Sequence, residues 1–113
     1  MSNSVKDESI IKSIQTTLTN LSLYGGRIDG LFGKVSRERL MVMAKKVYPS
    51  SNLINLPANG FDAKSVFIFI QTVLARVGLY TIKIDGIWGS TSQRSFDSLA
   101  TRYRELTGQP EWE

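Results

Sequence analysis

An internal repeat with a fixed spacing of 56 residues is the feature that most constrains this 113-residue chain. Without a gap, Ile14-Gln15-Thr16-Thr17-Leu18 aligns with Ile70-Gln71-Thr72-Val73-Leu74, Leu23-Tyr24 with Leu79-Tyr80, and Ile28-Asp29-Gly30-Leu31-Phe32-Gly33 with Ile84-Asp85-Gly86-Ile87-Trp88-Gly89. A gapless match of this length predicts two copies of one unit that share a single core. We expect one compact domain over residues 1–113, with repeats at 10–65 and 66–106 and a C-terminal tail at 107–113.

Apolar residues recur at helical spacing in four segments, which predicts an all-α fold, a small bundle of about four helices. The first helix presents Ile10, Ile11, Ile14, Leu18 and Leu21 on one face, and the second presents Leu40, Met43, Ala44 and Val47. Ser4 with Asp7 resembles a capping box for the first helix. The second should end near Tyr48, because Pro49 disfavours helical geometry in the residue before it.

The third helix should begin at Asp62, which is a good N-cap residue. Its apolar residues are Val66, Phe67, Ile70, Leu74 and Val77, with Ile68 and Phe69 on other faces. A helix that is apolar nearly all round is expected to be the most buried one. For the fourth helix, Ser90-Thr91-Ser92-Gln93 predicts a second capping box, and Gly108 with Pro110 predicts the end.

Each copy therefore reads as a helix, a tight loop and a second helix, and the loops contain an Asp-Gly pair. Glycine accepts positive φ and aspartate bonds to nearby backbone, so Asp29-Gly30 and Asp85-Gly86 favour turns. Ile28 and Ile84 are expected to anchor the loops in the core. Phe32 and Trp88, inside the turns, either fill the core or face a ligand.

Composition excludes several classes of function. The chain has no cysteine and no histidine, which rules out disulfides, Cys/His metal sites, an imidazole base and a thiol nucleophile. We expect no metal, no cofactor and no enzyme activity. The net charge of +4 favours anionic partners, but the charges are spread along the chain and a solvated mixed surface is the simpler interpretation.

The start of the sequence shows no pattern typical of a signal peptide. The first nine residues are polar and no apolar h-region follows, so we expect synthesis in the cytoplasm without a signal peptide. The longest apolar run, from Val66 to Ile70, is far shorter than the roughly 20 residues of a membrane span.

The order Ile-Gln-x-x-Leu, Leu-Tyr, then Ile-Asp-Gly-x-(Phe/Trp)-Gly-x-x-Ser resembles the peptidoglycan-binding domain type 1 family, over roughly residues 10–106. The segment from Leu56 to Ser65 is similar to that family's second, weaker glycine-containing loop before its third helix. The third helix of copy one would then also be the first helix of copy two, and copy two would be truncated. Ser36 and Ser92 stand where the family usually has Thr, and Val42 to Lys46 lacks its common Phe-Gln.

The resemblance implies binding to the peptide or glycan of peptidoglycan. Such modules usually accompany a lytic enzyme and also occur in phage lysins and virion proteins. The resemblance therefore implies a phage or lysis-associated accessory protein. We expect such a protein in the virion, or at the cell wall after release by lysis. A wall-binding groove needs aromatic faces, cations and hydrogen-bond donors. The candidate ligand-binding residues are Tyr24, Arg27, Asp29, Phe32, Tyr80, Lys83, Asp85 and Trp88.

Arg27 and Lys83 are the best local indication of function, because the repeat places a cation beside each Asp-Gly turn; solubility is the bland alternative. Alternative functions stay open. The module could keep the fold and bind a lytic enzyme or virion protein, or could act as a small glycosidase through Asp29, Glu38 or Asp85. Basic helix faces containing Arg94 and Arg102 are interrupted by acids, so we expect no nucleic-acid partner.

Overall fold

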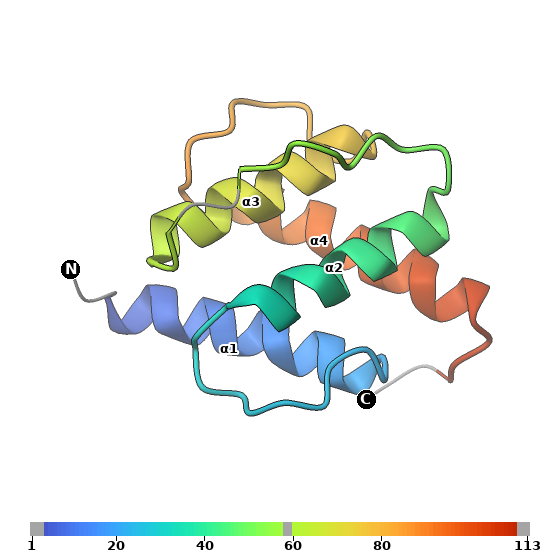
Figure 1. Ribbon diagram of the computed structural model, residues 1–113, viewed down its shortest axis with the longest axis horizontal. Helices are drawn as coiled ribbons and strands as arrows, with labels where there is room; N and C mark the ends of the chain where they lie inside the picture. Colours follow the sequence, from blue (N-terminus) through green and yellow to red (C-terminus); the bar gives the residue numbers. More distant parts are fainter. Residues whose placement is uncertain (1–3, 58–59, 111–113) are drawn as a thin grey trace.

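Four helices joined by three long loops make up the part of the protein that the structure describes (Figure 1). The computed structural model describes residues 4–57 and 60–110. The helices are α1 (Val5–Asn20), α2 (Lys34–Val47), α3 (Ala63–Arg76) and α4 (Ser90–Leu106). No strand occurs within the described residues, so the predicted all-α fold of four helices is confirmed.

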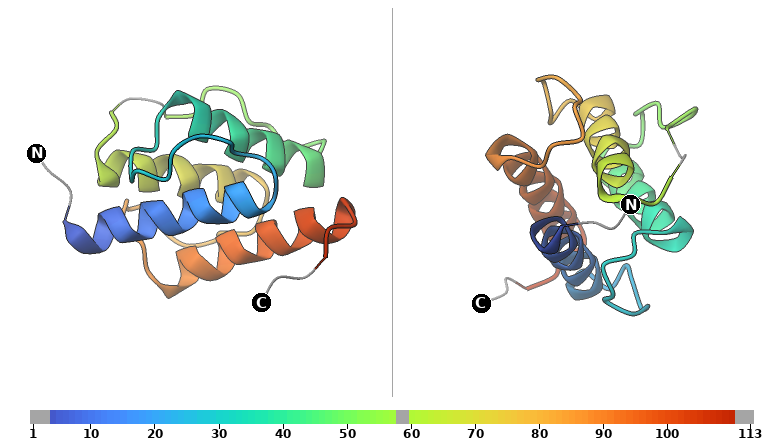
Figure 2. Two further views of the ribbon diagram at one scale, coloured as in Figure 1. Left: turned by 90° about the horizontal axis from the view of Figure 1, so that it is seen from below. Right: turned by 90° about the vertical axis from the view of Figure 1, so that its left-hand side faces the viewer.

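The loops are much longer than a tight turn. All four helices run in the same general direction, so each connection returns along the full length of a helix (Figures 1 and 2). A 14-residue helix such as α2 is about 21 Å long, and the connections occupy residues 21–33, 48–62 and 77–89. The tight loop predicted for each copy is therefore wrong: the Asp-Gly pair is one corner within a thirteen-residue return segment.

The core is shared by all four helices. The most extensive helix–helix contact joins α2 to α4, the second helices of the two copies. α3 has the largest buried fraction, with eight of its fourteen residues buried, which confirms the prediction from its apolar pattern. Phe67 of α3 and Phe96 of α4 pack against Trp88, with ring centroids 5.3 and 6.4 Å from that of the indole. No helix in the described part of the chain is both long enough and apolar enough to cross a bilayer.

The helix ends agree with the sequence except at one position. Ser4 caps α1, its hydroxyl accepting from the Asp7 amide at 3.1 Å, and α2 ends where predicted, before Tyr48. Asp62 is the N-cap residue of α3, although its carboxylate accepts from the Ser65 hydroxyl. The capping box predicted at Ser90 is wrong, because Gly89 is the N-cap residue and Ser90 already lies in the helix.

The predicted stop of α4 is also seen. α4 ends at Leu106, and Gly108 follows with φ of +72°. The Gln109 side-chain amide donates to the Leu21 carbonyl at 3.0 Å, which ties this end of the chain to the start of the first return loop. Residues 111–113 of the tail, Trp112 among them, lie outside the described residues.

Candidate functional site

The first Asp-Gly corner is held by one fully buried glutamine. The Gln15 side chain on α1 accepts from the Gly30 amide at 3.0 Å and donates to the Leu31 carbonyl at 3.0 Å. The Asp29 carboxylate accepts from the Leu31 amide at 2.9 Å, closing the turn on itself. A buried amide is stable only when its polar atoms are paired, so the helix and the corner hold each other in place.

The second corner repeats these bonds 56 residues later. Gln71 accepts from the Gly86 amide at 2.9 Å and donates to the Ile87 carbonyl at 2.9 Å, and the Asp85 carboxylate accepts from the Ile87 amide at 3.0 Å. Gln71 makes one further contact, a 3.0 Å hydrogen bond to the Ser92 hydroxyl on α4. The sequence repeat is thus also a repeat of hydrogen bonds.

Close packing explains the glycine in each corner. Gly30 and Gly86 have φ of +78° and +74°, in the left-handed region that favours glycine. A Cβ atom at Gly30 would lie 2.7 Å from the Glu8 side chain, and one at Gly86 would lie 2.7 Å from Lys64. Glu8 and Lys64 occupy equivalent positions in α1 and α3, so each corner is pressed onto the first turns of its copy's leading helix.

Both tyrosines predicted to bind ligand are buried and serve the loops. The Tyr24 hydroxyl donates to the Arg27 carbonyl at 2.8 Å, and the Tyr80 hydroxyl donates to the Lys83 carbonyl at 2.8 Å. The two tyrosines therefore stabilise the return segments from the core side, through these hydrogen bonds to the loop backbone.

The corner aspartates are held as carboxylates. The hydrogen bond from the Leu31 amide, followed by that from Gln15, lowers the pKa of Asp29 against the opposing effect of desolvation. The Ile87 amide and then Gln71 lower the pKa of Asp85 in the same way. These carboxylates act as acceptors for the backbone, and a low pKa is the opposite of what a general acid needs.

The remaining predicted residues divide between core and surface. Phe32 is fully buried and Trp88 nearly so, while the side chains of Arg27 and Lys83 are exposed. Ile28 and Ile84 do not anchor the loops in the core, because they are 40% and 39% exposed; the buried side chains four residues on, Phe32 and Trp88, do so instead.

The eight predicted residues do not form one site. The two corner loops lie on opposite sides of the bundle (Figure 1). Each corner is closed by its own hydrogen bonds, and none of the eight residues lines the wide hollow beside α2.

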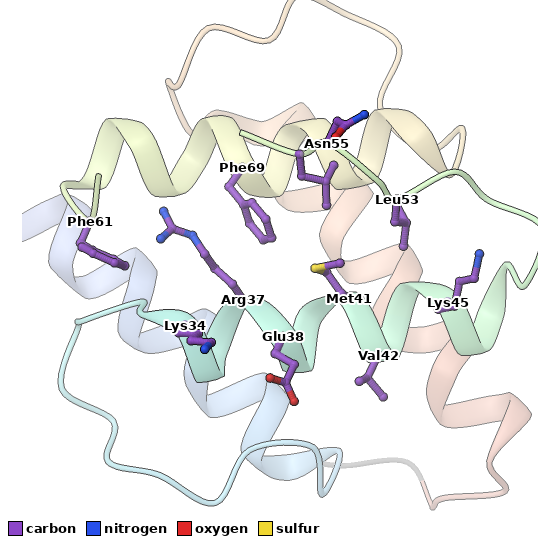
Figure 3. Close-up of a pocket in the computed structure, with 11 residues that line it drawn as sticks. Lys34, Arg37, Glu38, Met41, Val42, Lys45, Leu53, Asn55, Phe61 and Phe69 are labelled. Atoms are coloured by element: carbon purple, nitrogen blue, oxygen red, sulfur yellow. The ribbon is translucent and has the colours of Figure 1, made fainter. Parts of the chain in front are cut away.

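That hollow is an open groove of about 940 Å³ along α2, and sequence reasoning missed it (Figure 3). It lies between α2, the loop 48–62 and α3. α2 contributes Lys34, Arg37, Glu38, Met41, Val42 and Lys45. The loop contributes Leu53, Asn55, Leu56 and Phe61, and α3 contributes Phe69. Its lining is mainly apolar, with three cations and one carboxylate.

Arg37 is the unusual residue of this groove, because it is a cation that is only 6% exposed. Its guanidinium lies between two rings, with the carbon 4.8 Å from the centroid of Phe61 and 5.3 Å from that of Phe69. One terminal nitrogen donates to the Gly60 carbonyl at 2.6 Å. Burial lowers the pKa of Arg37, and the charge of Asp62 acts in the opposite direction.

The Nε atom of Arg37 is buried and has no hydrogen-bond partner within the described structure. A buried donor without a partner is uncommon in proteins, so the groove beside Arg37 is the candidate binding site. The one available sequence signal is that Arg37 falls on the same helix face as Met41, so a basic residue stands in a partly apolar stripe.

No cluster of three or more acidic side chains that would suit a metal ion occurs in residues 4–57 and 60–110. No family model, no curated protein and no solved structure matches this chain, so the family resemblance rests on the repeated motif and its spacing.

Proposed function

We propose that this chain is a non-catalytic binding module for the peptidoglycan of bacterial cell walls. The observation that carries the proposal is the position of the groove. It is lined by the second helix, the second loop and the third helix of copy one. Copy one is the copy whose sequence resembles the peptidoglycan-binding domain type 1 pattern through to the third helix.

The chemistry of the groove suits a wall fragment. Murein carries free carboxylates on its peptides, and Lys34, Arg37 and Lys45 line the groove against the single acid Glu38. Binding sites of this kind combine an apolar lining with a few placed polar groups. Arg37 is also held in a fixed orientation by its two rings, which reduces the entropy lost on binding.

A catalytic role has less support. Asp29 and Asp85 are both acceptors in closed turns and their pKa values are lowered. The loops that carry them run along opposite sides of the bundle (Figure 1). A glycosidase needs two carboxyl groups on either side of one bond, one of them with a raised pKa.

Retention on purified sacculi tests the proposal. The full chain should sediment with sacculi, and the amount should fall as salt is added if carboxylates are the ligand. The control is an unrelated basic protein of similar size and charge. Sedimentation no greater than that control would reject wall binding.

A second candidate is a protein-interaction module, for example in a virion or bound to a lytic enzyme. The supporting observation is that each corner exposes apolar side chains: Leu31 and Ile87, at equivalent positions, are 66% and 70% exposed. Ile28 and Ile84, three residues earlier, are also 40% and 39% exposed, and exposed apolar side chains that gather in a patch mark sites of protein contact. Affinity purification from infected or native cells with Leu31→Asp and Ile87→Asp as controls would separate this candidate from wall binding.

A further inference from the structure

We infer that the groove along α2 binds a short peptide with two carboxylates, the peptide stem of murein and not its glycan. This inference rests on the proposed function and goes further by naming the part of the wall that is recognised. It depends on the buried donor of Arg37, on the charges at the two ends of the groove and on the lining between them.

Arg37 provides one end of the site. Its Nε–H group is buried without a partner, and one terminal nitrogen is already bonded to Gly60. A carboxylate is the group that suits a guanidinium edge, because its two oxygens accept two parallel N–H bonds. Lys34 lines the same end of the groove and adds a second positive charge (Figure 3).

Lys45 provides the other end (Figure 3). Its ammonium group donates to the Ser51 carbonyl at 2.7 Å, which fixes its position and leaves two further donors for a ligand. Eight residues of α-helix separate Arg37 from Lys45, a rise of about 12 Å. An extended peptide covers that distance in about three to four residues.

The segment between the two ends is apolar. Met41 from α2 and Leu53 from the loop lie between the two ends (Figure 3), and Val42 and Leu56 also line the groove. These residues suit the apolar atoms of a peptide segment between two carboxylates. In the stem of murein, the free α-carboxylate of the γ-linked glutamate and the terminal carboxylate are separated by a diamino acid and an alanine. Glu38 on the same wall offers a partner for the ammonium group of a diamino acid.

A glycan is the poorer match. Sugars bind to open aromatic faces surrounded by groups that bond to hydroxyls. Phe61 is the exposed aromatic ring of the groove, and Arg37 already covers one of its faces. A polyol phosphate has no apolar segment for the middle of the groove.

The test is an NMR titration of the isotope-labelled full chain with the synthetic pentapeptide L-Ala-γ-D-Glu-L-Lys-D-Ala-D-Ala. Amide shifts should change along α2 and at residues 53–56. A peptide with both carboxylates amidated should bind roughly thirtyfold more weakly, because two charge-assisted contacts are lost. Equal binding of the two peptides, or shifts confined to the corners, would overturn the inference.

Two variants assign the ends of the site. Lys45→Ala removes an exposed cation and should weaken binding by about fivefold, whereas the neighbouring Lys46→Ala, outside the groove, should leave it unchanged. Arg37→Lys keeps the charge but removes the Nε–H group and should weaken binding by about tenfold or more. Unchanged affinity in both groove variants would contradict the assignment.

Sacculus sedimentation, run in parallel, separates this inference from the proposed function. Retention on sacculi without peptide binding would reject the inference and support wall binding through another part. Peptide binding in the groove without retention would support the inference and reject wall binding. Shifts along α2 on adding the muramyl disaccharide without a peptide would overturn the inference in favour of the glycan.

Discussion

The two copies share their corners but differ in the outer face of their second helix. Gln15 and Gln71 make equivalent bonds to equivalent corners, yet the face of α2 is a groove while the same face of α4 is open and polar. Shifting by 56 residues, the groove residues Arg37, Glu38, Met41, Val42 and Lys45 correspond to Gln93, Arg94, Asp97, Ser98 and Thr101.

The difference follows from what covers each helix. In copy one, loop 48–62 and α3 flank the face of α2 and shield it partly from water. Apolar side chains on that face therefore have apolar neighbours to pack against. In copy two no further helix follows α4 within the described residues, and the polar side chains of its face bond to each other, as Gln93 does to Asp97 at 2.9 Å. Features present in both copies therefore build the fold, and the feature found in one copy is the candidate for binding.

The largest effects should come from the glutamines of the two corners. Gln15→Leu and Gln71→Leu each leave a buried amide and carbonyl without a partner, and should lower the unfolding free energy by about 2 and 3 kcal/mol respectively. The larger loss is expected at Gln71, because it also bonds to Ser92. Urea denaturation of the two variants checks the order. A loss below about 0.5 kcal/mol in both would show that the corners are held by other contacts.

A smaller difference between the copies lies just after their first helices. Ser22 and Gly78 occupy equivalent positions with φ of +62° and +82°, so a serine is held in the left-handed region in copy one. Ser22→Gly should raise the unfolding free energy by about 0.5–1 kcal/mol, and Gly78→Ser should lower it by a similar amount. Thermal unfolding of both variants measures this; the same sign in both would contradict it.

The loss of unfolding free energy at low pH should depend equally on the two corners. The folded-state pKa values of Asp29 and Asp85 are lowered by hydrogen bonds from the Leu31 and Ile87 amides. Their contribution is therefore fully present above the ordinary aspartate pKa and is lost as the pH falls through the lowered folded-state pKa.

The variant that tests this carries Asp29→Asn and Asp85→Asn together. Its unfolding free energy, measured by urea titration between pH 6 and pH 3, at roughly one-unit steps, should fall less steeply than that of the wild type. Asp97→Asn is the matched control, and a profile for the double variant as steep as the wild type's would show that the corner carboxylates are not linked to folding.

Much of the fold could be predicted from the sequence, because helices depend on local periodicity. The apolar positions gave the number and approximate ends of the four helices, and the repeat predicted that the corners would be equivalent. The direction of the helices could not be predicted, since Asp-Gly specifies a local turn but not the path of the thirteen residues around it.

The candidate site was harder to predict, because it depends on tertiary packing. Tyr24 and Trp88 are aromatic residues beside a turn, a pattern that serves a ligand site and a core equally well, and the structure places them in the core. In the sequence alone, Arg37 is hard to distinguish from the other basic residues of the same helix. Its burial arises only when Phe61 and Phe69, 24 and 32 residues further on, fold over it.

Replacing the groove face by its counterpart from copy two tests the central claim most directly. The triple variant Met41→Asp, Val42→Ser and Lys45→Thr installs the residues of α4 at partly or fully exposed positions, so the fold should persist. Arg27→Ala with Lys83→Ala is the matched control at the corners. The measurement is sedimentation with purified sacculi: the account predicts that the groove variant is released and the corner variant is retained, and retention of the groove variant with release of the corner variant would contradict it.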